Sequence, residues 1–318
     1  MHSFSLAFTV VCPLFLMMAL GYALRCVGLF SGDFPARLNT LCFRVFLPLI
    51  LFVNVYQSDF SAAFQPRLIL FAVGSIAVLF AVLLLLVPRL SPQNTRRGVL
   101  VQGIFRSNFV LFGLPLTASL FGSSGAGTAA VLISFAVPLF NLLSVVTLEI
   151  FRGEAIKINR LLRGVLTNPL ILGALAAFFF VLTGFRLPPL LENTITDISK
   201  IATPLSLIVL GGSFTFGGLR GNGKALWGAV CGRLVLVPAV FMALAVALGF
   251  RGAALGALLA MFASPTAVSS FTMAQQMQAD DVLAGQIVVI TSLCSVLSIF
   301  VWIFLLNAAG LFGISAAV

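Results

Sequence analysis

Two apolar stretches of this chain each contain a proline beside small and polar residues. The first reads Arg106-Ser-Asn-Phe-Val-Leu-Phe-Gly-Leu-Pro115, and the second reads Met261-Phe-Ala-Ser-Pro-Thr-Ala-Val-Ser-Ser270. Proline removes a helix hydrogen bond and clashes with the preceding turn, so both helices are expected to break. The new helix N-termini at such breaks offer free N–H groups and partial positive charge. These two stretches therefore predict a binding site for an anion.

Each break has an alternative interpretation as a simple proline kink whose freed backbone groups are satisfied by neighbouring Ser and Thr. A single break would favour the kink, but a matched pair favours a site that lines a cavity. Asparagine amides can hold a carboxylate without a permanent charge, and they can equally join two helices by hydrogen bonds. The polar candidates are Asn54, Asn108, Asn141, Ser264, Thr266 and Ser269.

Arg106 is the charged residue closest to either break. It precedes Pro115 by nine residues, which is ~13 Å along a regular helix. It could attract anions toward the cytoplasmic opening of the site. We favour the interpretation that its long side chain snorkels to the lipid headgroups.

The composition places these stretches in a membrane. Of the 318 residues, 61% are hydrophobic and only 8% are charged, too few charges for a water-soluble surface. Lys and Arg number 18 against 8 Asp and Glu, but they lie singly at the ends of apolar runs, so we reject nucleic-acid binding. We expect about ten spans, near 5–25, 38–57, 68–88, 98–121, 126–151, 165–184, 196–217, 224–249, 252–277 and 282–308.

The distribution of Lys and Arg predicts the orientation. Eleven lie in odd-numbered loops and four in even-numbered loops, so the odd loops are expected to be cytoplasmic. Both termini then lie on the outer, periplasmic side of the inner membrane. The first apolar run, from Phe4 to Leu24, has no basic residue before it and is long enough to span. We interpret it as a retained helix rather than a signal peptide.

Prolines also predict an internal repeat. Two pairs are 156 residues apart and two are 150 apart, in the same order along both halves: Pro13 and Pro169, Pro48 and Pro204, Pro88 and Pro238, Pro115 and Pro265. Because five spans is an odd number, the second repeat would be inverted. We expect repeats at 1–151 and 165–318, joined by a short cytoplasmic linker at 152–164, within one membrane domain.

Catalytic and metal-binding patterns find little support. The only histidine is His2, and the five cysteines have no metal-ligand spacing. No catalytic or phosphate-binding motif is present. An intramembrane enzyme or sensor would need titratable groups that converge within the bilayer. We therefore predict no enzyme activity, no metal and no cofactor. A membrane pore is a further alternative, and it would differ from a carrier because its flux would not saturate.

The chain resembles the auxin efflux carrier family, which includes bacterial malonate-carrier-like members and the plant PIN-formed carriers. Matching stretches follow one another along nearly the whole chain. They are Pro13–Tyr22 (PLFLMMALGY), Leu47–Tyr56 (LPLILFVNVY), Arg106–Pro115, Ala202–Phe214 (ATPLSLIVLGGSF), Ala263–Ala274 (ASPTAVSSFTMA) and Asp281–Ser292.

This resemblance implies the bile-acid-symporter/NhaA-like fold: an all-α protein of ten transmembrane helices in two inverted five-helix repeats. Helices 4 and 9 would be broken and crossed. Helices 1, 2, 6 and 7 would form a scaffold that also joins a homodimer, and helices 3–5 and 8–10 would move as an elevator. The family's crossover maps to Asn108, Gly113, Pro115, Pro265 and Thr266, and its polar position on helix 5 maps to Asn141.

The predicted function is therefore a secondary transporter of a small organic anion. The long hydrophilic loop of the plant carriers is absent, which favours a mono- or dicarboxylate such as malonate over auxin. The alternative is a sodium-coupled organic-anion symporter of the bile-acid-symporter type. Neither break carries a carboxylate, which lowers that alternative, although Asn, Ser, Thr and backbone carbonyls could hold sodium. The substrate, the direction of transport and coupling to H+ or Na+ stay open.

Overall fold

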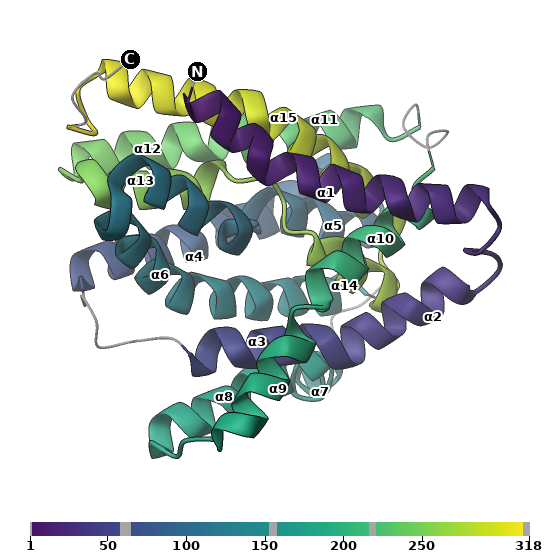
Figure 1. The fold of residues 1–318 in the computed structure, drawn as a ribbon. Helices are drawn as coiled ribbons and strands as arrows, with labels where there is room; N and C mark the ends of the chain where they lie inside the picture. Colours follow the sequence, from purple (N-terminus) through teal and green to yellow (C-terminus); the bar gives the residue numbers. More distant parts are fainter. Residues whose placement is uncertain (1, 58–64, 153–157, 216–220, 314–318) are drawn as a thin grey trace.

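The computed structural model describes residues 2–57, 65–152, 158–215 and 221–313, and within these ranges helices joined by turns and short loops make up the chain (Figure 1). The one extended pairing in these ranges is an isolated bridge between Ser107 and Thr266. The helices of the first half are α1 (His2–Cys26), α2 (Phe34–Leu41), the π-helix η1 (Cys42–Phe46), α3 (Leu47–Tyr56), α4 (Pro66–Leu90), α5 (Asn94–Phe105) and α6 (Phe109–Ile150).

The second half continues with helices of similar character. They are α7 (Ile158–Leu166), α8 (Pro169–Thr183), α9 (Pro189–Ser199), α10 (Ala202–Ser213), α11 (Gly223–Cys231), the π-helix η3 (Gly232–Leu236), α12 (Val237–Ala247), α13 (Gly252–Ala263), α14 (Ser269–Gln276) and α15 (Asp281–Ala308).

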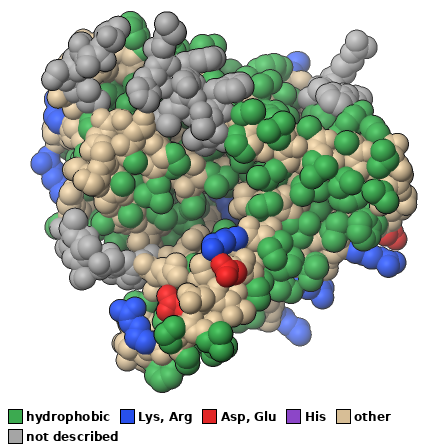
Figure 2. Space-filling model, viewed as in Figure 1, with side chains coloured by type: hydrophobic (Ala, Val, Ile, Leu, Met, Phe, Trp, Pro, Cys, Tyr) green, Lys and Arg blue, Asp and Glu red, His purple; other side chains and the backbone are tan. Residues whose placement is uncertain are grey.

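Several of these helices are long and apolar enough to cross a membrane. Six meet that criterion in the described residues: Phe34–Tyr56, Pro66–Leu90, Phe109–Ile150, Pro189–Ser213, Gly223–Ala247 and Asp281–Ala308. Shorter apolar helices cover Val11–Cys26, Pro169–Thr183 and Gly252–Ala263. Figure 2 shows hydrophobic side chains over much of one face, with charged side chains in small separate groups. This surface suits lipid, and the chain is a multi-pass membrane protein.

One long helix contains a sharp internal turn. The 42 residues of α6 are two helices that meet at Gly122, whose φ of 63° and ψ of −145° are not helical. A side chain rarely tolerates this left-handed backbone, whereas glycine adopts it without a steric penalty. The turn separates residues 109–121 from 123–150, which matches the boundary expected between the fourth and fifth spans.

Helices of the two halves pack against each other in pairs. From the first half, α1 lies along α10 of the second half, and α3 lies along α8 of the second half (Figure 1). The contact of α1 with α10 is close enough to require glycine. A Cβ at Gly21 would lie 1.9 Å from the Ile208 carbonyl oxygen, and one at Gly211 would lie 1.9 Å from the Met18 carbonyl oxygen. Small residues at these positions let the two backbones approach.

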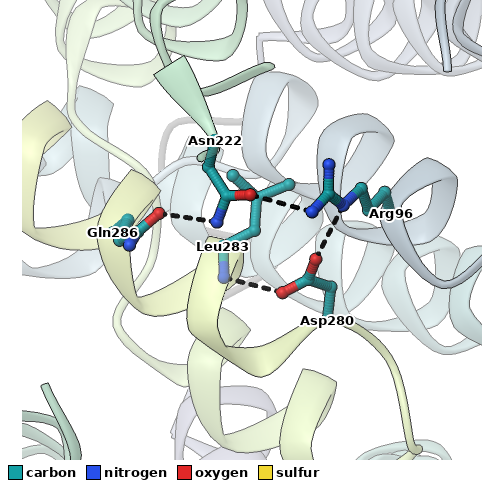
Figure 3. Close-up of polar contacts among 5 residues, drawn as sticks. All are labelled: Arg96, Asn222, Asp280, Leu283 and Gln286. Carbon is teal, nitrogen blue, oxygen red and sulfur yellow. Dashed lines mark hydrogen bonds and ion pairs between the residues drawn. The ribbon is translucent and has the colours of Figure 1, made fainter. Parts of the chain in front are cut away.

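A polar cluster joins the starts of α5 and α15 to the residue before α11 (Figure 3). The Arg96 guanidinium donates to Asp280 at 3.0 Å and to the Asn222 side-chain oxygen at 2.9 Å. Asn222 in turn donates to the side chain of Gln286 at 3.0 Å. Asp280 also accepts from the Leu283 N–H at 2.9 Å, so it caps α15. Three helix ends are thereby tied together.

Candidate functional site

Two helices stop near the centre of the molecule, and their broken segments cross. The chain leaves α5 after Phe105 and resumes helix at Phe109, and it leaves α13 after Ala263 and resumes at Ser269. Between them, the Asn108 N–H donates to the Pro265 carbonyl at 2.8 Å. The Ala267 N–H donates to the Arg106 carbonyl at 3.4 Å. Backbone groups freed by one break are therefore satisfied by the other, as membrane interiors require.

The first break does not lie where the proline predicted it. Pro115 and Gly113 both lie inside the first helical part of α6, residues 109–121, and the break covers 106–108 instead. A proline removes one hydrogen bond and can be absorbed within a helix, so the expectation for Pro115 is wrong. Pro265, in contrast, lies in the second break as expected. The sequence signal of the first break is the polar run of Arg106, Ser107 and Asn108. Side chains of this kind can form hydrogen bonds that compete with those of the helix backbone.

Two predicted site residues build the crossing itself. Thr266 donates its hydroxyl to the Gly103 carbonyl at 2.7 Å, and its N–H donates to the Thr291 hydroxyl at 3.2 Å. Ser264 returns its hydroxyl to the Ala260 carbonyl one turn earlier in α13. These side chains hold the broken segments in place and do not face the cavity described next.

A cavity of about 110 Å³ lies beside the crossing. Among the predicted residues, it is lined by Asn54, Arg106, Asn108, Asn141 and Ser269. Gly113, Pro115, Ser264, Pro265 and Thr266 are not among its lining residues. The wall opposite the crossing comes from α3, α8 and α10, and includes Leu47, Ile50, Leu51, Leu170, Thr203 and Ser206. Sequence reasoning missed Ser107, Thr203 and Ser206, which carry no distinctive pattern along the chain.

Arg106 is buried at this cavity, with 4% of its surface exposed. Its guanidinium donates to the Asn141 side-chain oxygen at 2.6 Å and to the Ser269 hydroxyl at 2.8 Å, and it contacts the Met273 sulfur. The expectation that Arg106 snorkels to the headgroups is therefore wrong. The backbone turns extended at this residue, which directs the side chain inward rather than along a helix surface.

The charge of Arg106 has no acidic partner among the described residues. The ion pairs found there join Arg96 to Asp280, Glu149 to Arg152 and Asp197 to Lys200. No Asp or Glu from the described part of the chain lines the cavity. An arginine buried without a carboxylate is costly unless an anion compensates it.

Two further buried groups at the cavity lack hydrogen-bond partners in the described structure. They are the amide nitrogen of Asn108 and the hydroxyl of Ser107. A buried donor without a partner costs about 1–3 kcal/mol, so such groups are usually met by a ligand or water. Asn108 also stands at the N-terminus of α6, and Ser269 begins α14. Both helix ends contribute partial positive charge at the cavity.

The opposite, C-terminal ends of the broken helices are held by Arg233 on η3. This side chain is fully buried. Its guanidinium donates to four carbonyls, those of Ile104 and Phe105 at 3.1 and 3.2 Å and those of Met261 and Ser264 at 2.9 and 2.7 Å. Sequence reasoning missed this role of Arg233, because nothing in the local sequence shows that the side chain faces two helix ends.

The cavity suits a small anion. It offers one buried guanidinium, amide and hydroxyl donors, and two helix N-termini. Its volume is about 110 Å³. Drug-sized ligands occupy sites of roughly 300–1,000 Å³, so a compact carboxylate fits better than a large ring system.

Comparisons with known proteins extend over nearly the whole chain. The sequence model of a family described as "Membrane transport protein" matches residues 6–303. The chain is 25% identical over 297 residues to an "Uncharacterized transporter" of Methanothermobacter thermautotrophicus, which covers 92% of this chain and 96% of that relative. It is 24% identical over 310 residues to a protein of Rhizobium meliloti named "Putative malonate transporter", over 95% of this chain and 96% of that relative.

Proposed function

The chain belongs to the membrane transport protein family of auxin efflux carriers, and from this premise we propose that it carries a small organic anion across the inner membrane as an elevator-type secondary transporter. Membership of the family that the sequence resembled is confirmed. The family and both relatives are named as transporters rather than enzymes.

The observation that carries the proposed substrate class is the buried guanidinium of Arg106. It faces a small cavity with no described carboxylate, beside the unpartnered amide nitrogen of Asn108. A mono- or dicarboxylate would supply the missing negative charge and accept these hydrogen bonds. Malonate is the first candidate because it fits a cavity of about 110 Å³ and because one relative's name contains it.

The proposed architecture is ten spans in two inverted repeats of five. In order, the spans are α1, α2–α3, α4, α5 with residues 109–121, residues 123–150, α8, α9–α10, α11–α12, α13–α14 and α15. Support comes from the reciprocal packing of α1 with α10 and of α3 with α8, which exchanges partners between the halves. The two breaks that meet at Ser107 and Thr266 also lie at corresponding places in the halves.

The elevator mechanism is supported by where the cavity lies. One wall comes from the crossing and α6, which belong to the proposed moving part. The other comes from α3, α8 and α10, which belong to the proposed scaffold. Sliding of the first group along the second would carry the bound anion with the crossing, since Arg106, Asn141 and Ser269 move as one unit. We further propose that two copies associate through the scaffold helices.

A binding and flux experiment tests the proposal. Purified protein is expected to gain thermal stability with malonate, because a ligand that binds the folded state raises its stability. Proteoliposomes are expected to show saturable counterflow of labelled malonate. Arg106→Gln should abolish both signals, whereas Arg44→Gln, which changes an exposed arginine on η1, should preserve them. Folded protein with no binding or flux for a panel of small carboxylates would refute the proposal.

The sodium-coupled alternative is distinguished in the same preparation. Counterflow is measured with sodium chloride and again with choline chloride at equal ionic strength. Flux that persists in choline supports a carrier that needs no sodium. Flux that requires sodium would favour the symporter, with the ion held by hydroxyl, amide or carbonyl oxygens near the breaks.

A further inference from the structure

We propose that Arg233 determines the charge selectivity of the cavity, by cancelling the negative ends of α5 and α13 so that the positive ends of α6 and α14 act alone on the substrate. This inference rests on the proposed function, because it concerns the same anion site. The carbonyls that Arg233 binds do not belong to residues that line the cavity. Arg233 is therefore a positioning residue, which acts on the substrate through the charges of the helix ends.

The crossing brings four helix ends together. Each C-terminus carries roughly −0.5 of an elementary charge and each N-terminus roughly +0.5. Two ends of each sign would leave little net field for an anion. The C-terminal ends here are those of α5 and α13, and the N-terminal ends are those of α6 and α14. A cation bound only to the C-terminal ends would remove the negative contribution and leave the positive one.

Arg233 has that geometry. Its Nη1 donates to Ile104 and Phe105 at the end of α5, and its Nε and Nη2 donate to Ser264 and Met261 at the end of α13. One planar guanidinium thus bridges carbonyls from both halves of the chain. It is fully buried, and none of the ion pairs in the described residues includes it. The carbonyls therefore take the place of a counter-ion.

The two buried arginines consequently differ in whether their guanidinium groups can still bind a substrate. Arg233 is saturated by four carbonyls and does not line the cavity. Arg106 lines the cavity and meets two neutral oxygens and a sulfur. Arg106 is thus available to the substrate, whereas Arg233 sets the field in which the substrate binds.

The test compares a dianion with a monoanion of the same size. Affinities for malonate and for its monoamide, malonamate, are measured by calorimetry on wild type, Arg233→Met and Arg233→Lys, with Arg44→Met as the control for loss of an arginine. We expect Arg233→Met to weaken malonate about tenfold more than malonamate, because uncancelled helix ends repel two charges more than one. Arg233→Lys, which keeps the charge, should retain most of the preference for malonate.

Three outcomes separate the possible explanations. If Arg233→Met weakens both ligands by the same factor, or neither, the residue is only structural and the inference is overturned. If Arg233→Met does not fold, Arg233→Lys decides: a retained preference for the dianion supports the inference, and a lost preference overturns it. If wild type binds neither ligand nor any other small carboxylate, the proposed function itself fails.

Discussion

Arg106 and Arg233 both lie at the crossing of the broken helices, but their guanidinium groups have different partners. Both are buried, and neither pairs with a carboxylate in the described parts of the chain. Arg233 is compensated by carbonyls of two helix ends. Arg106 is held by Asn141 and Ser269, which orient the guanidinium without neutralising it.

Because the Asn141 side chain is uncharged, we expect it to orient Arg106 without cancelling the positive charge that would bind an anion. In Asn141→Asp, a carboxylate would replace the amide oxygen that accepts from Arg106 at 2.6 Å. The resulting ion pair would neutralise the arginine, and the lost amide donor would remove the side-chain hydrogen bond to the Val137 carbonyl. We expect malonate affinity to fall at least ~30-fold, since a buried charge pair is worth several kcal/mol when it is well formed.

Calorimetric titration with malonate checks this prediction. Asn193→Asp provides the control, because Asn193 is exposed on α9 and lies outside the cavity. Equal malonate affinity in Asn141→Asp and wild type would contradict a role for the uncompensated charge of Arg106.

At the residue scale, polarity in an apolar stretch was the useful sequence signal. Asn54, Asn108, Asn141 and Ser269 were predicted by it, and all four line the cavity. The direction of the Arg106 side chain and the partners of Arg233 could not be predicted. The first depends on backbone that leaves the helix at Arg106. The second depends on carbonyls of Ile104 and Phe105, more than one hundred residues away in the chain, and of Met261 and Ser264, 28 and 31 residues away.

The close packing of α1 with α10 makes a prediction at the scale of helices. In Gly21→Ala, the added methyl would lie 1.9 Å from the Ile208 carbonyl oxygen unless the helices separate. Overpacking of this kind costs about 1–3 kcal/mol. A lower melting temperature in detergent is expected. Gly74→Ala is the matched control, since nothing lies within 4 Å of a methyl there, and its melting temperature should stay equal or rise. Equal melting temperatures for Gly21→Ala and wild type would show that the two helices separate freely.

The cluster around Asp280 should stabilise three helix ends. Asp280→Ala removes the acceptor that caps the Leu283 N–H, and it also removes the ion-pair partner of Arg96. The side chains of Asp280 and Arg96 are 18% and 31% exposed. A cap is worth about 1 kcal/mol, and a partly buried ion pair adds to it. We expect a loss of about 1–2 kcal/mol in thermal or denaturant unfolding.

The control for this prediction is Asp197→Ala. That carboxylate pairs with Lys200, but the two side chains are 73% and 69% exposed, so its removal should change stability very little. If both variants lose the same stability, the Asp280 cluster holds no more than a surface ion pair does.

Helix positions were largely predictable, whereas the ends of the broken helices were not. Long apolar runs predicted segments that coincide with the helices, because a lipid-facing helix must be apolar along its length. The break expected at Pro115 lies at residues 106–108 instead, where the Asn108 N–H donates to the Pro265 carbonyl of the second break. Such long-range backbone pairing leaves no local trace in the sequence.

At the scale of the whole molecule, the count of spans and the bias of Lys and Arg predict the orientation. In a variant that lacks its five cysteines, Ser31→Cys should be cytoplasmic and Arg186→Cys periplasmic; both positions are exposed and lie between helices. A membrane-impermeant maleimide should label residue 186 in intact cells, and residue 31 only after the membrane is permeabilised. Labelling of both in intact cells would contradict the ten-span arrangement.

The crossing of the two broken segments also bears on how the protein is synthesised. Translation proceeds at roughly 5–20 residues per second, so the ~160 residues between Ser107 and Thr266 take roughly 10–30 s to emerge from the ribosome. During that interval Arg106, the Asn108 N–H and the carbonyls that end α5 lack their later partners. Such groups are costly in lipid. The nascent first half should therefore stay beside the translocon or a membrane chaperone until the second half arrives to complete it.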